Sequence, residues 1–314
     1  MRASFSAEAT AWGRREFILS AAAAALAGCR TSSLDKLDET AQFDLVQSEA
    51  EAVTAADFRR YLGSDWLLTS RRFVALRRLE AAFDKVLREV RETQVEAGAA
   101  VWYVYNMGIV VKTPCVCFSV DLMHRRAAEL APQLDFALIT HNHDDHYTMA
   151  FYDAMNDAGK PVISNFLDNY GCADAAMRGY TPGCRTFNIA DVTVRTQRVD
   201  HNSYLVDFTT AFEIDAAGYR ILHSGDCSSL AKLNPSVTPD LWCVHPYCGI
   251  ELADGYAKIR PHLIAIQHIN ELCHELGNWR WSWQDGLRAR DAAIAAGGKA
   301  VLPHWGERIR SCSI

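Results

Sequence analysis

The apolar positions of the chain follow two different periods, and the change comes near residue 98. From about residue 55 to residue 97, apolar side chains recur at helical spacing with charged ones between them, which predicts amphipathic helices. Beyond residue 100, short apolar runs alternate with helical stretches. These predict strands at 101–112 (with a turn at 106–108), 115–121, 136–140, 161–163, 192–199, 204–212, 219–222, 241–244, 263–266 and 300–302, and helices near 125–130, 149–158 and 283–296.

The alternation of strands and helices predicts a single layered α/β domain. Of the 314 residues, 49% are hydrophobic and 22% are charged, which is typical of a globular protein. The formal net charge is −6, and the sequence contains no long basic stripe. We therefore expect no nucleic-acid partner.

The first residues have the pattern of an export signal and are kept apart from the fold. Arg14 and Arg15 precede an apolar run that is too short to span a bilayer, and this pair resembles a twin-arginine (Tat) signal. The sequence Leu26-Ala27-Gly28-Cys29 resembles a lipoprotein box, in which the cysteine is acylated. The resemblance implies a signal peptide at 1–29 and a bacterial lipoprotein tethered through Cys29 at the periplasmic face of a membrane. We expect a tether at 30–54 and a folded domain at 55–314, with a helical extension at about 55–97.

Ten cysteines are present, and Cys29 is the first of them. In an oxidising periplasm some of the others could pair, for example Cys172 with Cys184 or Cys243 with Cys248. We interpret most of them as small, buried apolar residues. The pairing therefore stays open.

A dense group of metal-ligand side chains follows the apolar strand predicted at 136–140. His141, His143, Asp145 and His146 form the pattern H-x-H-x-D-H. A loop at the end of a buried strand can turn several side chains toward one point. Imidazole and carboxylate are ligands that zinc and similar metals prefer. The cluster therefore predicts a metal site.

This cluster resembles the metallo-β-lactamase superfamily, and the resemblance covers most of residues 100–306. It implies an αββα sandwich that holds two metal ions. The family's third histidine for the first metal corresponds to His201, which follows the strand predicted at 192–199. The family's bridging aspartate corresponds to Asp226 in the Gly225-Asp226 step.

Two histidines compete for the last ligand of the second metal. His304 belongs to a His-Trp-Gly sequence after one predicted strand, and His268 follows another. The chain resembles the branch that acts on N-acyl phospholipids, in which the late His-Trp-Gly histidine is the ligand and the earlier one faces the substrate. We therefore place His304 ahead of His268 as the ligand. Residues 270–285 would then be an insertion.

The resemblance implies a binuclear hydrolase with two zinc ions, manganese and iron being the other candidates. One ion would be bound by His141, His143 and His201, the other by Asp145, His146 and His304, with Asp226 between them. A metal-bridging hydroxide would then attack an ester, lactone or phosphodiester bond. In this scheme Asp145, Asp226 and His268 are the catalytic residues.

The substrate would be a small or lipid-like molecule. True β-lactamases of this superfamily generally lack an aspartate at the position of Asp226, so the resemblance favours another class of hydrolase. Two other functions stay open: an iron-dependent redox enzyme on the same fold and a non-catalytic metal-binding lipoprotein. The diiron type usually has a glutamate where this chain has His143, which favours hydrolysis.

Several further side chains are candidates for supporting roles. Asp121 ends a predicted strand, where it could hold a ligand imidazole or simply form a turn. His245 follows another predicted strand and either contacts the substrate or is structural. Glu271 and His274 either contact the metal ligands from outside or are simply surface residues.

Overall fold

The computed structural model describes residues 45–46, 48–167 and 184–309. The chain divides into two compact units, Met1–Val46 and Gln47–Ile314. The expected signal peptide, Cys29 and most of the expected tether lie outside the described residues. The second unit begins before residue 55, and Ala50 and Val53 are buried in its core. Every described helix is too short or too polar to cross a membrane.

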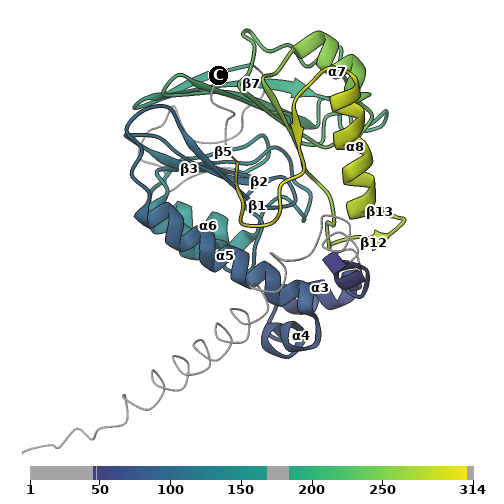
Figure 1. Cartoon of the computed structure of the whole chain (residues 1–314). Coiled ribbons are helices and arrows are strands. Elements are labelled where there is room, and N and C mark those ends of the chain that lie inside the picture. Colours follow the sequence, from purple (N-terminus) through teal and green to yellow (C-terminus); the bar gives the residue numbers. More distant parts are fainter. Residues whose placement is uncertain (1–44, 47, 168–183, 310–314) are drawn as a thin grey trace, which may run out of the picture. The chain divides into compact units, whose positions relative to one another are not determined.

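The first of the two large sheets has six strands in the order β15-β1-β2-β3-β4-β5 (Figure 1). Strands β1, β2 and β3 form an antiparallel meander, while β3, β4 and β5 are parallel. Its strands are β1 (Ala100–Tyr105), β2 (Gly108–Lys112), β3 (Cys117–Val120), β4 (Phe136–Leu138), β5 (Val162–Ile163) and β15 (Arg308–Ile309).

The second large sheet has seven strands in the order β14-β11-β10-β9-β8-β7-β6. Its strands are β6 (Thr186–Ile189), β7 (Val192–Val199), β8 (Thr209–Ala216), β9 (Tyr219–His223), β10 (Leu241–Val244), β11 (Leu263–Ile266) and β14 (Ala300–Val301). A separate two-stranded sheet pairs β12 (Glu275–Leu276) with β13 (Trp279–Arg280).

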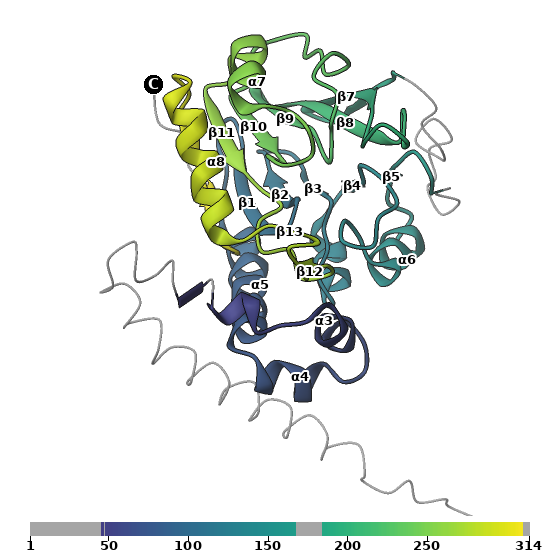
Figure 2. The same ribbon diagram turned by 90° about the vertical axis from the view of Figure 1, so that its right-hand side faces the viewer.

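The two large sheets face each other, and helices cover their outer faces (Figure 1, Figure 2). Helices α5 and α6 lie outside the first sheet, and α7 and α8 lie along the second. This is the αββα sandwich that the family resemblance implied. The helices are α3 (Ala55–Leu62), α4 (Trp66–Arg72), α5 (Val74–Glu92), α6 (Met149–Asp157), α7 (Leu252–Ile259) and α8 (Trp283–Ala295), with a 3₁₀ helix at Ala127–Gln133.

Strand β1 shows how the layers divide the core. Val101 and Tyr103 point into the cluster between the two sheets, whereas Trp102 and Val104 point into the cluster beneath the helices. Successive side chains of a strand alternate between its faces, and here both faces are covered. The whole strand is therefore apolar and buried.

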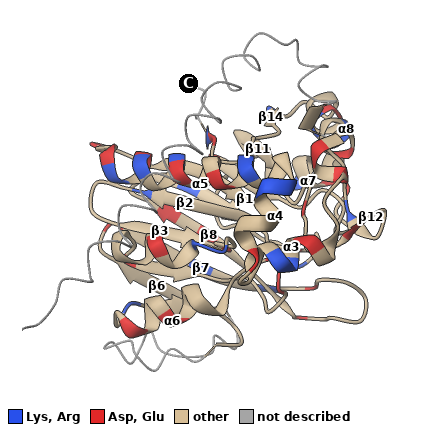
Figure 3. Ribbon diagram, turned by 90° about the horizontal axis from the view of Figure 1, so that it is seen from below, with Lys and Arg blue, Asp and Glu red and all other residues tan. Residues whose placement is uncertain are grey.

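Helix α5 confirms the helical period of the sequence. Its buried residues recur at helical spacing, and its exposed face carries Lys, Arg, Asp and Glu in alternation (Figure 3). The region predicted to be helical at 55–97 forms three helices. Gly63 ends α3, and Phe73, in an extended conformation, separates α4 from α5.

Near the second sheet, one strand prediction was wrong, and one possible cysteine pairing that the sequence left open is absent. Strand β8 begins at Thr209 rather than at residue 204, because Tyr204 and Val206, which are 92% and 59% exposed, lie in a loop. Cys243 and Cys248 are not joined, and Cys243 points into the core between the sheets. Cys172, the other suggested partner, lies outside the described residues.

Candidate metal centre

Strand directions bring the ends of several strands to one edge of the second sheet. Strands β9, β10, β11 and β14 are mutually parallel, and β7 runs the same way because it is antiparallel to β8, which is antiparallel to β9. Polar side chains follow the carboxyl ends of these strands. His201 comes after β7, Asp226 after β9, His245 after β10 and His268 after β11.

The H-x-H-x-D-H loop reaches the same edge from the facing sheet, where it follows β4. The backbone N–H of Thr210 in β8 donates to the carbonyl of Thr140, at 2.8 Å, and so joins the two sheets beside the loop. Gly225 makes the close approach possible. It has a φ of +53°, and an added Cβ would lie 2.9 Å from the Thr140 side chain.

The first ligand group consists of His141, His143, His201 and Asp226, whose ligand atoms all lie within 4.8 Å of one another. The Nε2 atoms of His141 and His201 are 3.9 and 3.5 Å from Asp226 Oδ2. The ring of His143 lies against those of His141 and His201, with centroids 4.6 and 4.7 Å away. These are the four residues that the resemblance assigned to one metal and its bridge.

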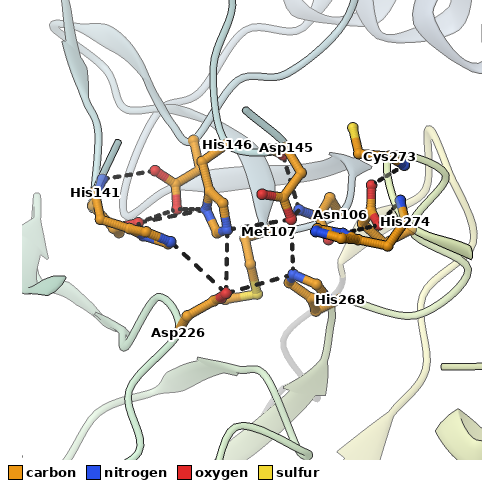
Figure 4. Close-up of polar contacts among 12 residues, drawn as sticks. Asn106, Met107, His141, Asp145, His146, Asp226, His268, Cys273 and His274 are labelled. Atoms are coloured by element: carbon orange, nitrogen blue, oxygen red, sulfur yellow. Dashed lines mark hydrogen bonds and ion pairs between the residues drawn. The ribbon is translucent and has the colours of Figure 1, made fainter. Parts of the chain in front are cut away.

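The second group consists of Asp145, His146 and His268, again with ligand atoms within 4.8 Å of one another. His268 Nε2 is 3.0 Å from Asp145 Oδ2, and His146 Nε2 is 3.6 Å from the same oxygen. Asp226 Oδ2 lies 3.4 Å from His146 Nε2 and 3.6 Å from His268 Nε2. Figure 4 shows Asp226 between His141 of the first group and His268 of the second.

His304 is not part of this arrangement, and the preference for it over His268 requires correction. Its side chain is exposed and stacks on Trp283, with ring centroids 4.5 Å apart. Strand β14 is the edge strand, three places from β9, and neighbouring strands are about 4.8 Å apart, so a residue following it emerges far from Asp226. His268 has a φ of +59° and donates its backbone N–H to Asn106 O at 3.0 Å, which turns it back toward the centre.

A shell of hydrogen bonds fixes the imidazoles. Thr140 donates its backbone N–H and its hydroxyl to Asp121, each at 2.8 Å, so this hydroxyl accepts from His141 Nδ1 at 2.9 Å. His146 Nδ1 lies 2.9 Å from Asp121 Oδ2 and donates to it. In both rings a proton therefore sits on Nδ1, and Nε2 is the nitrogen that would bind a metal ion. Of the two roles considered for Asp121, the structure shows contact with a ligand imidazole.

Asn106 is a member of the site that the sequence did not reveal. Its side-chain amide donates to the carbonyl oxygen of Asp145 at 2.9 Å and to its Oδ2 at 3.0 Å. Asn106 occupies the turn between β1 and β2 with a φ of +55°. The sequence predicted this turn, but no local pattern relates it to a loop so distant in the chain.

The charges of the centre are arranged to attract cations. Burial alone would raise the pKa of Asp226, but His146 and His268 hold it well below its ordinary value. Burial alone would likewise lower the pKa of His146, but Asp226, Asp145 and Asp121 raise it well above the ordinary value. Three buried carboxylates in one place need compensating positive charge.

The remaining candidates lie beside the second group. His245 is buried, and its ring stacks on His268 with centroids 4.0 Å apart. Glu271 is fully buried, accepts a hydrogen bond from His274 Nδ1 at 2.8 Å, and forms a further potential ligand group with His274 and Asp145.

No family model matches the sequence, and comparison with curated proteins gives no match. Solved structures do match. The metallo hydrolase Igni18 from Ignicoccus hospitalis is 16% identical, with a TM-score of 0.52, over 68% of this chain and 98% of that one. A possible metal-dependent hydrolase from Veillonella parvula is 11% identical, with a TM-score of 0.50, over 68% of this chain and 99% of that one.

A third similar structure is CmlA, a diiron β-hydroxylase from Streptomyces venezuelae, which is 12% identical with a TM-score of 0.51. That match covers 69% of this chain and 55% of the hydroxylase. At these identities the likeness concerns the fold. The chain therefore shares its αββα fold with these metal-dependent proteins.

Proposed function

We propose that the protein is a metal-dependent hydrolase that holds two zinc ions and cleaves an ester, lactone or phosphodiester bond in a small or lipid-like substrate. One observation carries the proposal. Within the described residues, Nε2 of His141, His146 and His201 and Oδ1 of Asp226 are buried and make no hydrogen bond. His141, His201 and Asp226 belong to the first ligand group, and His146 belongs to the second.

Such atoms are costly unless an ion satisfies them. A buried polar atom without a partner costs about 1–3 kcal/mol, more if it is charged. Imidazole nitrogens and carboxylate oxygens suit zinc, and they also suit manganese and iron. The residues therefore fit a pair of divalent ions.

His141, His143 and His201 would hold one ion, and Asp145, His146 and His268 the other, with Asp226 shared. Bound metal ions would supply Lewis acidity and lower the pKa of water toward about 7. The chain's own residues orient the ligands. Asp121 and Thr140 keep the protons of His146 and His141 on Nδ1, and Asn106 fixes the Asp145 carboxylate by donating to its Oδ2.

Elemental analysis of the purified protein tests this function, followed by a screen over lactones, carboxylic esters and phosphodiesters. We expect about two metal ions per chain and hydrolysis of at least one class. The Asp226→Asn variant should retain its fold but lose metal and activity together. A folded protein that takes up no metal would overturn the proposal.

A second candidate function is an iron-dependent oxidation, which the likeness to the diiron hydroxylase CmlA supports. The same elemental analysis separates the two functions. Iron as the native metal, with an absorbing chromophore, would favour oxidation. A third candidate, a metal-binding lipoprotein without catalysis, would be favoured if Asp145→Ala abolished metal binding yet left the cellular role intact.

We also propose that the protein is exported and anchored to the periplasmic face of a membrane through an acylated Cys29. Arg14 and Arg15 before the apolar run and the box ending at Cys29 support this. Membrane fractionation after fatty-acid labelling should find label on the wild type and none on Cys29→Ala. Equal partition of both forms into the soluble fraction would contradict the anchor.

A further inference from the structure

His245 lies at the metal centre, yet the two proposed ligand groups are complete without it. Its side chain is 4% exposed, and its ring is parallel to that of His268 within 7°. One ring nitrogen of His245 lies within 4.8 Å of both a carboxylate oxygen of Asp226 and a ring nitrogen of His268. The sequence left open whether this residue contacts substrate or only packs.

The protonation of His245 follows from one hydrogen bond. The backbone N–H of Tyr247 donates to His245 Nδ1 at 3.2 Å. A nitrogen that accepts a hydrogen bond carries no proton, so the proton of the neutral ring is on Nε2. The Nδ1 lone pair is already engaged, and Nε2 has no free lone pair. In this tautomer His245 is a hydrogen-bond donor rather than a metal ligand.

The ring is held by neighbours that are themselves fixed. The Tyr247 hydroxyl donates to the carbonyl of Asp285 at 2.7 Å, and Asp285 belongs to the capping box that starts α8. Trp281 stacks on Tyr247, with centroids 5.6 Å apart, and meets His245 edge to face at 5.0 Å. A donor held in this way costs little reorganisation when charge develops beside it.

We propose that His245 is a further catalytic residue, whose Nε2–H donates a hydrogen bond to the substrate oxygen that gains negative charge during hydrolysis. That oxygen is the carbonyl oxygen of an ester or lactone, or a non-bridging oxygen of a phosphodiester. No proton is transferred, since Nε2 keeps its hydrogen and the bond only strengthens as the oxygen becomes more negative. The inference rests on the proposed hydrolase function.

A pair of substitutions tests the donor. His245→Phe keeps an aromatic ring to stack on His268 but removes the N–H, whereas His245→Gln places an amide N–H near the same position. We expect metal content and KM to stay near wild type in both. The kcat should fall about 100-fold in His245→Phe, as for loss of one preorganised donor, and recover at least about tenfold in His245→Gln. His304→Phe is the matched control, because that ring is exposed and outside the cluster.

The tautomer of His245 can be determined without an activity assay. Nitrogen-detected NMR of ¹⁵N-histidine-labelled, metal-free protein should show His245 protonated on Nε2, with the signal assigned by its loss in His245→Phe. A proton on Nδ1 would overturn the proposal, as would loss of metal from His245→Phe, which would make His245 a ligand. Wild-type hydrolysis with equal kcat in His245→Phe would overturn the role of His245 alone. A metal-loaded wild type that hydrolyses no substrate would overturn the hydrolase function and this role with it.

Discussion

Asp121 contacts none of the atoms proposed to bind metal, yet its hydrogen bond to His146 fixes the orientation of that imidazole ring. Its Oδ2 accepts from His146 Nδ1 at 2.9 Å while Thr140 donates to both of its oxygens. Such outer contacts contribute about 10- to 100-fold to metal affinity. We expect Asp121→Asn to weaken metal binding by that factor, measured by competition with a chromophoric chelator. Asp240→Asn is the control, since Asp240 makes the same 2.9 Å contact to the exposed His262. Equal affinities in the two variants would contradict the role.

Single substitutions also test whether His268 or His304 is the last ligand of the second metal. His268→Ala should lose one of the two metal ions and retain the other, because His268 belongs to the second of the two proposed ligand groups and not to the first. His304→Ala should keep both ions. Elemental analysis after exhaustive dialysis measures the difference, and metal loss from His304→Ala instead would restore the order that the sequence suggested.

The sequence alone predicted most of this centre, because four of its residues lie in one short loop. His201 and Asp226 came from a family pattern at strand ends. His304 was misplaced because strand order is not written in the sequence: only the sheet shows that β14 is an edge strand and that β11 lies nearer to β9. Asn106 was missed because its contact with Asp145 joins two distant turns.

The step from β9 to Asp226 depends on the glycine before that aspartate. Gly225→Ala should destabilise the fold by about 2–4 kcal/mol, since it combines a left-handed backbone with a 2.9 Å clash against Thr140. Gly218→Ala has a comparable positive φ of +88° but open space around it, so it should cost only about 1–2 kcal/mol. Urea unfolding measures both. Equal losses would show that the close approach to Thr140 does not matter.

Whole elements were predictable where the period was long and clean, as in α5, β7 and α8. The start of β8 was misjudged because residues 204–206 form an apolar run like that of a strand, although Tyr204 and Val206 are exposed in a loop. Helix α7 was missed because Gly255 interrupts its pattern. The glycine is needed there, since an added Cβ would lie 2.6 Å from the Trp242 ring.

At the scale of the whole molecule, His124 fastens the N-terminal helices to the sandwich. Its ring stacks on Phe83 of α5 at 4.0 Å, and its Nε2 lies 3.0 Å from the Tyr61 hydroxyl of α3. Its Nδ1 accepts from the backbone N–H of Arg126 at 3.1 Å. The ring is therefore neutral, and burial, with help from Arg126 and Arg125, holds the pKa of His124 well below 6.5.

The stabilisation that His124 contributes should decrease at acidic pH. Below about pH 6.5, His124 binds a proton in the unfolded chain but stays neutral in the folded protein. The contribution of His124 to the free energy of unfolding is therefore fully present above that pH and declines by up to about 1.4 kcal/mol per pH unit below it. His124→Asn keeps an acceptor for Arg126 N but does not titrate. In urea unfolding of metal-free protein, the stability difference between wild type and variant should shrink by about 1.4 kcal/mol from pH 7.5 to pH 5.5. A constant difference would contradict the assignment.

Because β15 pairs with β1, the first sheet can be completed only after the end of the chain has been synthesised. Ile309 pairs with Val101, so the first strand of the sheet is synthesised long before its outer neighbour exists. Until then β1 presents an open edge, which can recruit strands from other molecules. Closure of the fold is therefore an event that follows synthesis of residue 309. A nascent chain, or one that stops short of residue 309, leaves this edge of β1 unpaired.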